Sequence, residues 1–293
     1  MSTEGKSFIK VFAAGCLWGT VGLFVKQMTA LGSSPAYTSF LRLLLSTLLM
    51  LPITLLLAGP KAFRVGKRTF ITCILMGIVS TGLFNIIYSR SITLNGMAIA
   101  SVLMYTSPVF VGIASVLLFQ EHLTRHKWLA LLINVIGCAL TATGGHFEGA
   151  NLALAGILFG IGAGFTYAMS AVFGRIAMQE KASSFAVTTY SLLFGCLFLT
   201  IFNHPWTTVE NPLNPRLLLT GALYALIPTA LTYSLYYSSL GTIRQTSKVQ
   251  VVASIEPVVA TLLGVLVFGE SIGAGNIAGI ALVLFSIFLF SRE

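Results

Sequence analysis

Glu256 is the acidic residue best placed to do chemistry, because it stands beside Pro257 inside the apolar stretch 248–268. A charge near the centre of a bilayer costs about 2.5–3.5 kcal/mol on insertion scales, so such residues usually face a protein interior. Proline removes a backbone donor and frees a carbonyl, and a broken helix beside an acid is typical of ligand-binding elements. Glu256 is therefore a candidate binding or gating residue, and a structural ion pair or backbone cap is the equally open alternative. Pro108 predicts a matching helix break without the charge.

Four cations also fall within apolar stretches: Lys26, Arg42, Arg90 and Arg175. Lys26 and Arg175 could attract a substrate carboxylate at opposite mouths of one pathway. Long cationic side chains also reach the nearest interface easily, and we expect that behaviour of these two. Arg42 lies deeper in its stretch, which predicts a protein partner. If the four line a cavity, their excess over Glu256 favours an anionic or zwitterionic substrate.

Aromatic rings fall inside the apolar stretches as well as at their ends. A ring can stack on a flat solute or bind a cation over its face, and a buried tyrosine hydroxyl needs a partner; ordinary packing is the alternative. Gln250 adds an embedded amide. The candidate substrate-cavity residues are therefore Trp18, Tyr88, Tyr105, Tyr167, Tyr237, Gln250 and Glu256, with Pro108 and Pro257 as gating or helix-break candidates.

Composition decides what kind of scaffold holds these residues. Of the 293 residues 56% are hydrophobic and only 9% are charged, with a mean hydropathy of +0.91, whereas soluble proteins carry about 25% charged residues. The chain therefore belongs in a lipid bilayer as an all-α integral membrane protein. The four cysteines stand singly without zinc-like spacing, and no phosphate-binding glycine loop is present. We expect no metal, no cofactor and no nucleic-acid partner.

Membrane spans of roughly 20 apolar residues must position the candidates, and glycine, proline and asparagine clusters separate such spans here. The sequence predicts ten transmembrane helices, at about 8–31, 36–58, 69–92, 97–120, 127–145, 152–176, 185–203, 217–240, 248–268 and 272–291.

Orientation follows from the loops, because Lys and Arg concentrate on the cytoplasmic side. With the N-terminus and the C-terminus both cytoplasmic, the outer loops hold only Arg216. The inner loops then hold twelve basic residues: Lys6, Lys10, Lys61, Arg64, Lys67, Arg68, Arg125, Lys127, Lys181, Arg244, Lys248 and Arg292.

The chain also repeats itself with an offset of 149 residues. Matching positions include Pro108 with Pro257, Glu121 with Glu270, Trp18 with Tyr167, Phe24 with Phe173, and Lys26 with Arg175. Each repeat holds five predicted spans, an odd number, so the second must enter the membrane from the opposite side. We expect two inverted five-helix repeats, 1–145 and 146–293, in one compact membrane domain, an arrangement suited to alternating access. A duplication kept only for packing is the alternative.

Several short motifs fall at corresponding places in this frame. Ser254-Ile255-Glu256-Pro257 and Phe268-Gly269-Glu270 are echoed by Ser107-Pro108 and Phe119-Gln120-Glu121, while Leu17-Trp18-Gly19 and Leu41-Arg42 lie in the first two spans. From about residue 8 to 291 the chain resembles the drug/metabolite transporter superfamily, EamA type. That resemblance implies a ten-helix carrier with a central cavity for a small metabolite. Ser107 departs from the symmetry, because it replaces an acid at the position that matches Glu256.

The expected function is secondary transport of a small molecule, an amino acid or related compound, across the cell membrane by alternating access, with export implied by the resemblance. Protons are candidate partners through Glu256. A channel-like facilitator is one alternative. An integral membrane enzyme is another, disfavoured because the chain has no Asp and no clustered acids.

Overall fold

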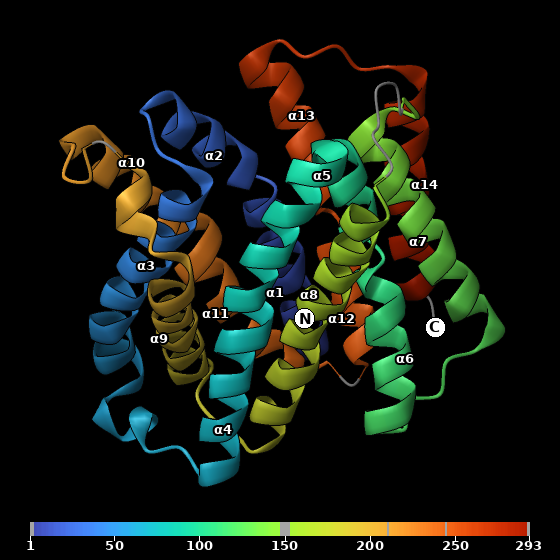
Figure 1. Cartoon of the computed structure of the whole chain (residues 1–293). Coiled ribbons are helices and arrows are strands. Elements are labelled where there is room, and N and C mark those ends of the chain that lie inside the picture. The colour runs from blue at the N-terminus through green and yellow to red at the C-terminus, as the bar shows by residue number, and fades with distance from the viewer. Residues whose placement is uncertain (1–2, 147–152, 210, 244, 292–293) are drawn as a thin grey trace.

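The computed structural model describes residues 3–146, 153–209, 211–243 and 245–291. This part of the chain folds into helices and the links between them, without a β-strand (Figure 1). Arg244 and Arg292, which the sequence assigns to inner loops, lie outside the described residues.

The first half contains seven α-helices and two irregular helical segments. Their bounds are α1 Thr3–Trp18, α2 Val21–Ala30, α3 Pro35–Ala58, the 3-10 turn η1 Pro60–Phe63, α4 Lys67–Leu75, the π-helical η2 Met76–Leu83, α5 Phe84–Met104, α6 Ser107–Phe119 and α7 Arg125–Thr143.

The described part of the second half also contains seven α-helices and two irregular helical segments. It comprises α8 Leu154–Gln179, α9 Ser184–Asn203, the 3-10 turn η3 Pro205–Thr208, α10 Pro215–Ala225, the π-helical η4 Leu226–Leu231, α11 Thr232–Leu240, α12 Thr246–Ala253, α13 Glu256–Phe268 and α14 Ala274–Ser291.

Eight helical runs in the described residues are long and apolar enough to cross a membrane, fewer than the ten spans predicted. The difference arises partly at Lys67–Met104, a single run of 38 residues. Such a run would measure about 57 Å if straight, against a hydrocarbon core of about 30 Å. The run is not straight, because Gly96 has φ 82° and ψ 162° and changes the chain direction. Ser107–Phe119 and Ala274–Phe290 are apolar but shorter.

Three predicted spans consist of two helices with a short break. The span at 97–120 is interrupted at Tyr105-Thr106, and the span at 248–268 is interrupted at Ser254-Ile255, 149 residues later. The first span breaks at Gly19-Thr20, whereas α8, its partner under the same offset, is continuous. The π-helical segments η2 and η4 also lie near this offset. A π turn inside an α-helix often marks a functional site.

The helices pack side by side, with α3, α9 and α10 at one side of Figure 1 and α7 and α14 at the other. Between them, α1 packs against α11, α12 and α13, and α8 packs against α5, η2 and α6. Large apolar side chains face outward, including Leu56, Leu117 and Leu266, each more than 70% exposed. An apolar exterior of this kind suits contact with lipid.

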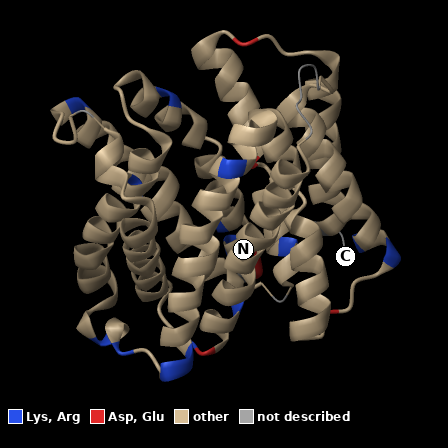
Figure 2. Cartoon of the chain, in the orientation of Figure 1, with Lys and Arg blue, Asp and Glu red and all other residues tan. Residues whose placement is uncertain are grey.

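Basic residues gather at the lower end of Figure 2, around the link between α3 and α4. Lys61, Arg64, Lys67 and Arg68 are the residues of this link and of the start of α4. These four are among the twelve basic residues from which the cytoplasmic side was predicted.

Two glycines allow α1 and α8 to approach the helix breaks closely. A Cβ on Gly15 would lie 2.5 Å from Ile255 Cγ2 and 2.7 Å from the Ala253 carbonyl oxygen. A Cβ on Gly164 would lie 2.6 Å from Thr106 Oγ1. The two glycines are 149 residues apart, and so are Ile255 and Thr106. The first helix of each half therefore packs against the helix break in the other half, with no room for a side chain at the glycine.

Gly15→Ala should destabilise the protein, because the added methyl group meets backbone at Ala253 that cannot rotate away. Overpacking of a close helix contact costs about 1–3 kcal/mol. Thermal unfolding of the purified protein in detergent measures the effect. Gly22→Ala is the matched control in the neighbouring helix, since a Cβ there meets nothing within 4 Å; equal loss of stability in both variants would contradict the close-approach argument.

Candidate substrate site

Glu256 is the first residue of α13, directly after the break at Ser254-Ile255. Its Oε2 accepts a hydrogen bond of 3.2 Å from the hydroxyl group of Tyr167 on α8. The side chain of Glu256 is therefore held between two elements that belong to the same half of the chain but are far apart in sequence.

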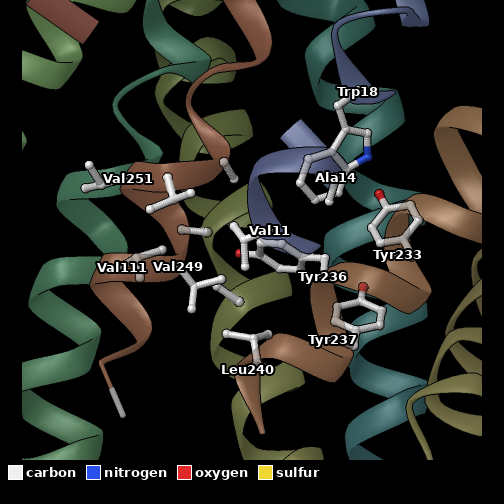
Figure 3. Close-up of a cluster of buried hydrophobic side chains, with 14 of the residues drawn as sticks. Val11, Ala14, Trp18, Val111, Tyr233, Tyr236, Tyr237, Leu240, Val249 and Val251 are labelled. Atoms are coloured by element: carbon white, nitrogen blue, oxygen red, sulfur yellow. The ribbon is translucent and has the colours of Figure 1, made fainter. Parts of the chain in front are cut away.

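Trp18 is the centre of an aromatic cluster beside this acid. Its ring centroid lies 5.0 Å from that of Tyr236, 5.5 Å from Tyr233 and 6.3 Å from Tyr167. Figure 3 shows Trp18 at the end of its helix with Tyr233 and Tyr236 approaching it from α11. Trp18 is only 6% exposed, so the three tyrosine rings pack closely around its indole.

The aromatic contacts repeat with the 149-residue offset. Trp18 contacts Tyr233, which stacks on Tyr237 with centroids 5.5 Å apart. The corresponding residues are Tyr167, Phe84 and Tyr88: Tyr167 lies 5.5 Å from Phe84, which stacks on Tyr88 at 5.4 Å. We call these six residues the aromatic cross. Its two arms meet where Trp18 and Tyr167 pack together.

Phe84 and Tyr233 are the members of the aromatic cross that the predicted cavity residues did not include. The repeat offset contained the signal, because Phe84 lies 149 residues before Tyr233. Phe84 was omitted because the prediction selected rings that carry a polar group, and phenylalanine has none.

Hydroxyl and amide groups satisfy the polar ends of the rings. Tyr236 donates to Gln250 Oε1 at 2.8 Å, and Gln250 Nε2 donates to Ser107 Oγ at 3.4 Å. Ser107, which replaces the second acid, therefore binds the Gln250 amide and joins α6 to α12.

The remaining candidate tyrosines differ in their surroundings. Tyr88 shares a hydrogen bond of 3.0 Å with Ser101, and Tyr237 shares one of 3.1 Å with Ser170. Tyr237 is 1% exposed and lies within the packed core. Tyr105 lies in the break before α6, within electrostatic range of Glu256. Of the predicted cavity residues, Tyr167 thus contacts the acid directly, and Tyr88 and Tyr105 lie within electrostatic range of it.

The helix breaks predicted at Pro108 and Pro257 are present, and each lies directly before the helix that contains the proline. Each is the second residue of its helix, α6 or α13. A proline there is compatible with the helix, because an amide in the first turn has no intrahelical acceptor. The helix breaks precede the prolines, and Glu256 opens a new helix whose N-terminus favours a negative charge.

The embedded cations have different environments. Arg42 places its guanidinium 5.3 Å from the ring centroid of Tyr224, and its buried Nε has no hydrogen-bond partner in the described structure. The predicted protein partner of Arg42 is thus an aromatic ring. Arg90 is exposed on α5.

Lys26 and Arg175 bind protein groups, although the sequence predicted that they extend to the interface. Lys26 forms an ion pair with Glu270, and Arg175 donates to the carbonyl oxygens of Leu240 and Ile243. Sequence spacing did not reveal these contacts, because Lys26 and Glu270 are 244 residues apart in the chain.

A shallow depression on the surface between α2 and α10 is lined by Gln27, Leu31 and Arg216 among others, and includes none of the aromatic cross.

A bundle of apolar helices with an apolar exterior and an acid among interior rings defines a multi-pass protein of the cell membrane. Known proteins identify it further. The chain belongs to the EamA-like transporter family, which matches residues 6–143 and again residues 154–292.

Relatives from bacteria and archaea match most of the chain. An uncharacterized transporter of Archaeoglobus fulgidus is 28% identical over 283 residues, 97% of this chain and 95% of the relative. The uncharacterized transporter YwfM of Bacillus subtilis is 24% identical over 96% of this chain and 92% of the relative. A protein of Salmonella typhimurium called a "probable amino-acid metabolite efflux pump" is 21% identical over 81% of this chain and 76% of its own length.

A protein of known crystal structure has the same fold. It superposes with a TM-score of 0.81 and covers 99% of this chain and 98% of its own, at 17% sequence identity. The chain is therefore a transporter of the EamA-like family with the fold shared by that structure.

Proposed function

We propose that this protein is a secondary transporter that exports an amino acid or related compound by alternating access. It crosses the membrane ten times as two inverted five-helix repeats, 1–145 and 146–293, with both termini in the cytoplasm. The turn at Gly96 separates two of these crossings, and the helix breaks before α6 and α13 make two others discontinuous.

The aromatic cross is the observation that carries this proposal. Trp18 and Tyr167 are equivalent under the repeat offset and contact each other, so their contact lies where the two halves meet. Carriers built from inverted repeats place the substrate near this junction, between discontinuous helices. A solute bound there can be approached from either face as the halves rock.

Glu256 supports the assignment of an amine-bearing substrate. A carboxylate bordered by rings binds an ammonium group by charge and by cation–π attraction. Arg42 lies within electrostatic range of Tyr233, another ring that contacts Trp18. Its Nε, which has no hydrogen-bond partner in the described structure, suits a substrate carboxylate. The two charges together favour a zwitterion. The name of the Salmonella typhimurium relative agrees with this substrate class and with export.

Uptake into proteoliposomes tests the proposal. With an imposed proton gradient and a panel of labelled amino acids, amines and sugars, we expect saturable uptake of at least one amino acid and none of the sugars. Uptake should be accompanied by thermal stabilisation of the detergent-purified protein by the same solute, because a ligand that binds only the folded state raises its stability. A single-channel conductance would contradict alternating access, and stabilisation by sugars alone would contradict the substrate class.

A further inference from the structure

Glu121 and Glu270 leave their helices in the same local geometry at opposite ends of the bundle (Figure 1). Each follows a residue with left-handed backbone, Gln120 with φ 53° or Gly269 with φ 65°. Each donates its own amide to the carbonyl six residues earlier, at 3.1 and 3.2 Å respectively. The residues are 149 positions apart. Any difference between the contacts of the two carboxylates therefore reflects what each end of the bundle offers them.

At the lower end of Figure 1, the carboxylate of Glu121 caps the start of α12. Its Oε1 accepts the amide of Thr246 at 2.7 Å, and its Oε2 accepts the hydroxyl group of Ser247 at 3.2 Å. The first amides of a helix have no intrahelical acceptor, and an anion there is stabilised by the helix dipole. Glu121 thus ties the end of α6 to α12.

Arg175, on α8, binds the link between α11 and α12 at the same end of the bundle. It donates to the carbonyl oxygens of Leu240, the last residue of α11, and of Ile243, the latter at 2.8 Å. Arg175 is also within electrostatic range of Glu121. Arg175 and Glu121 together bind both ends of the link between α11 and α12.

At the upper end, the equivalent residues make a different contact. Lys26 and Glu270 bind each other, and the Lys26 ammonium group lies 3.9 Å from the ring centroid of Phe268. Both charged side chains are 52% exposed. Among the described residues neither is hydrogen-bonded to a helix end. An exposed ion pair of this kind contributes little stability and separates readily.

The repeat offset identifies what the upper residues would bind in a closed arrangement. Thr246 and Ser247 correspond to Met97 and Ala98, which follow the turn at Gly96 and open a new helical segment. Met97 is 62% exposed. Leu240 and Ile243 correspond to Ser91 and Leu94, at the end of the segment before Gly96. The upper end therefore contains a second pair of helix ends of the kind that Glu121 and Arg175 bind below.

We propose that Arg175–Glu121 and Lys26–Glu270 are reciprocal latches that hold the inner and outer gates. In this structure the lower latch is closed on the helix ends and the upper one is open as a simple ion pair. When the carrier reverses, Glu270 caps the amides of Met97 and Ala98, and Lys26 binds the carbonyls before Gly96. Glu121 and Arg175 release α12 and pair with each other. The inference rests on alternating access in the proposed function, but not on the identity of the substrate.

Hydrogen–deuterium exchange of the full-length protein in nanodiscs tests the latches without a known substrate. Glu121→Gln should open the lower end and close the upper one. We expect amide exchange to become roughly tenfold faster in residues 245–250 and slower in residues 97–101, a coupling typical of linked sites. Glu270→Gln should do the opposite, slowing exchange in 245–250. If Glu121→Gln fails to fold, Glu121→Asp shortens the same latch and is measured instead.

Glu180→Gln is the matched control, because Glu180 is an exposed acid at a helix end whose partner, Arg68, lies 2.8 Å away. It should leave exchange in both segments unchanged. Faster exchange at both ends in Glu121→Gln would show a merely structural cap and overturn the latches, as would no change at either end. Reciprocal exchange in a protein that moves no amino acid would retain the latches and refute the substrate class. Amino-acid uptake without reciprocal exchange would retain the substrate class and refute the latches.

Discussion

We expect Glu256→Gln to lower proton-gradient-driven amino-acid uptake into proteoliposomes about a hundredfold. The amide keeps the size of the side chain and can still accept the Tyr167 hydrogen bond, so packing is preserved and only the charge is lost. Losing one partner of a buried charge interaction costs about 2–5 kcal/mol, and roughly 1.4 kcal/mol corresponds to a tenfold change in binding. Initial rates with saturating and subsaturating labelled substrate measure the effect.

Exchange of internal for external substrate without a gradient separates the two roles open to Glu256. If the carboxylate binds the substrate ammonium group, Glu256→Gln loses exchange and gradient-driven uptake together. If it carries a proton, exchange persists while gradient-driven accumulation disappears. Glu180→Gln, at the surface, should retain both activities. Unchanged uptake in Glu256→Gln would remove this residue from the transport mechanism.

Trp18→Ala should have the second large effect, on stability as well as on binding. The indole contacts three tyrosine rings and is almost fully buried, and removing a buried Trp costs about 3–5 kcal/mol. We expect a clear fall in the unfolding temperature of the detergent-purified protein. Thermal stabilisation by the transported amino acid should disappear.

Trp18→Phe separates packing from recognition. It keeps an aromatic face toward Tyr233 and Tyr236, so most of the stability should return together with measurable ligand stabilisation. Trp206→Ala is a control for loss of a tryptophan, since Trp206 is 48% exposed and lies outside the aromatic cross. An equal loss of stability in Trp206→Ala, or full ligand stabilisation in Trp18→Ala, would contradict the central position of Trp18.

The sequence by itself determined the class of protein. Low charge and long apolar stretches require a lipid environment, because too few polar residues remain to face water. The links between helices were also predictable at places such as Ser34-Pro35, where Ser34 accepts the amide of Tyr37 and the proline starts α3. The 149-residue offset marked the equivalent helix breaks, since proline near a helix start leaves a local signal.

The tertiary structure decided which polar and charged residues meet. Lys26 and Glu270, or Glu121 and the amide of Thr246, lie more than a hundred residues apart in sequence, and neither periodicity nor composition encodes a partner at that separation. Sequence reasoning therefore assigned Lys26 to the interface, whereas the folded chain provides a nearer acid. The sequence named an acid and a set of rings. Packing of α1, α8 and α5 brought Trp18, Tyr167 and Phe84 together, because contact between helices depends on which faces are turned inward.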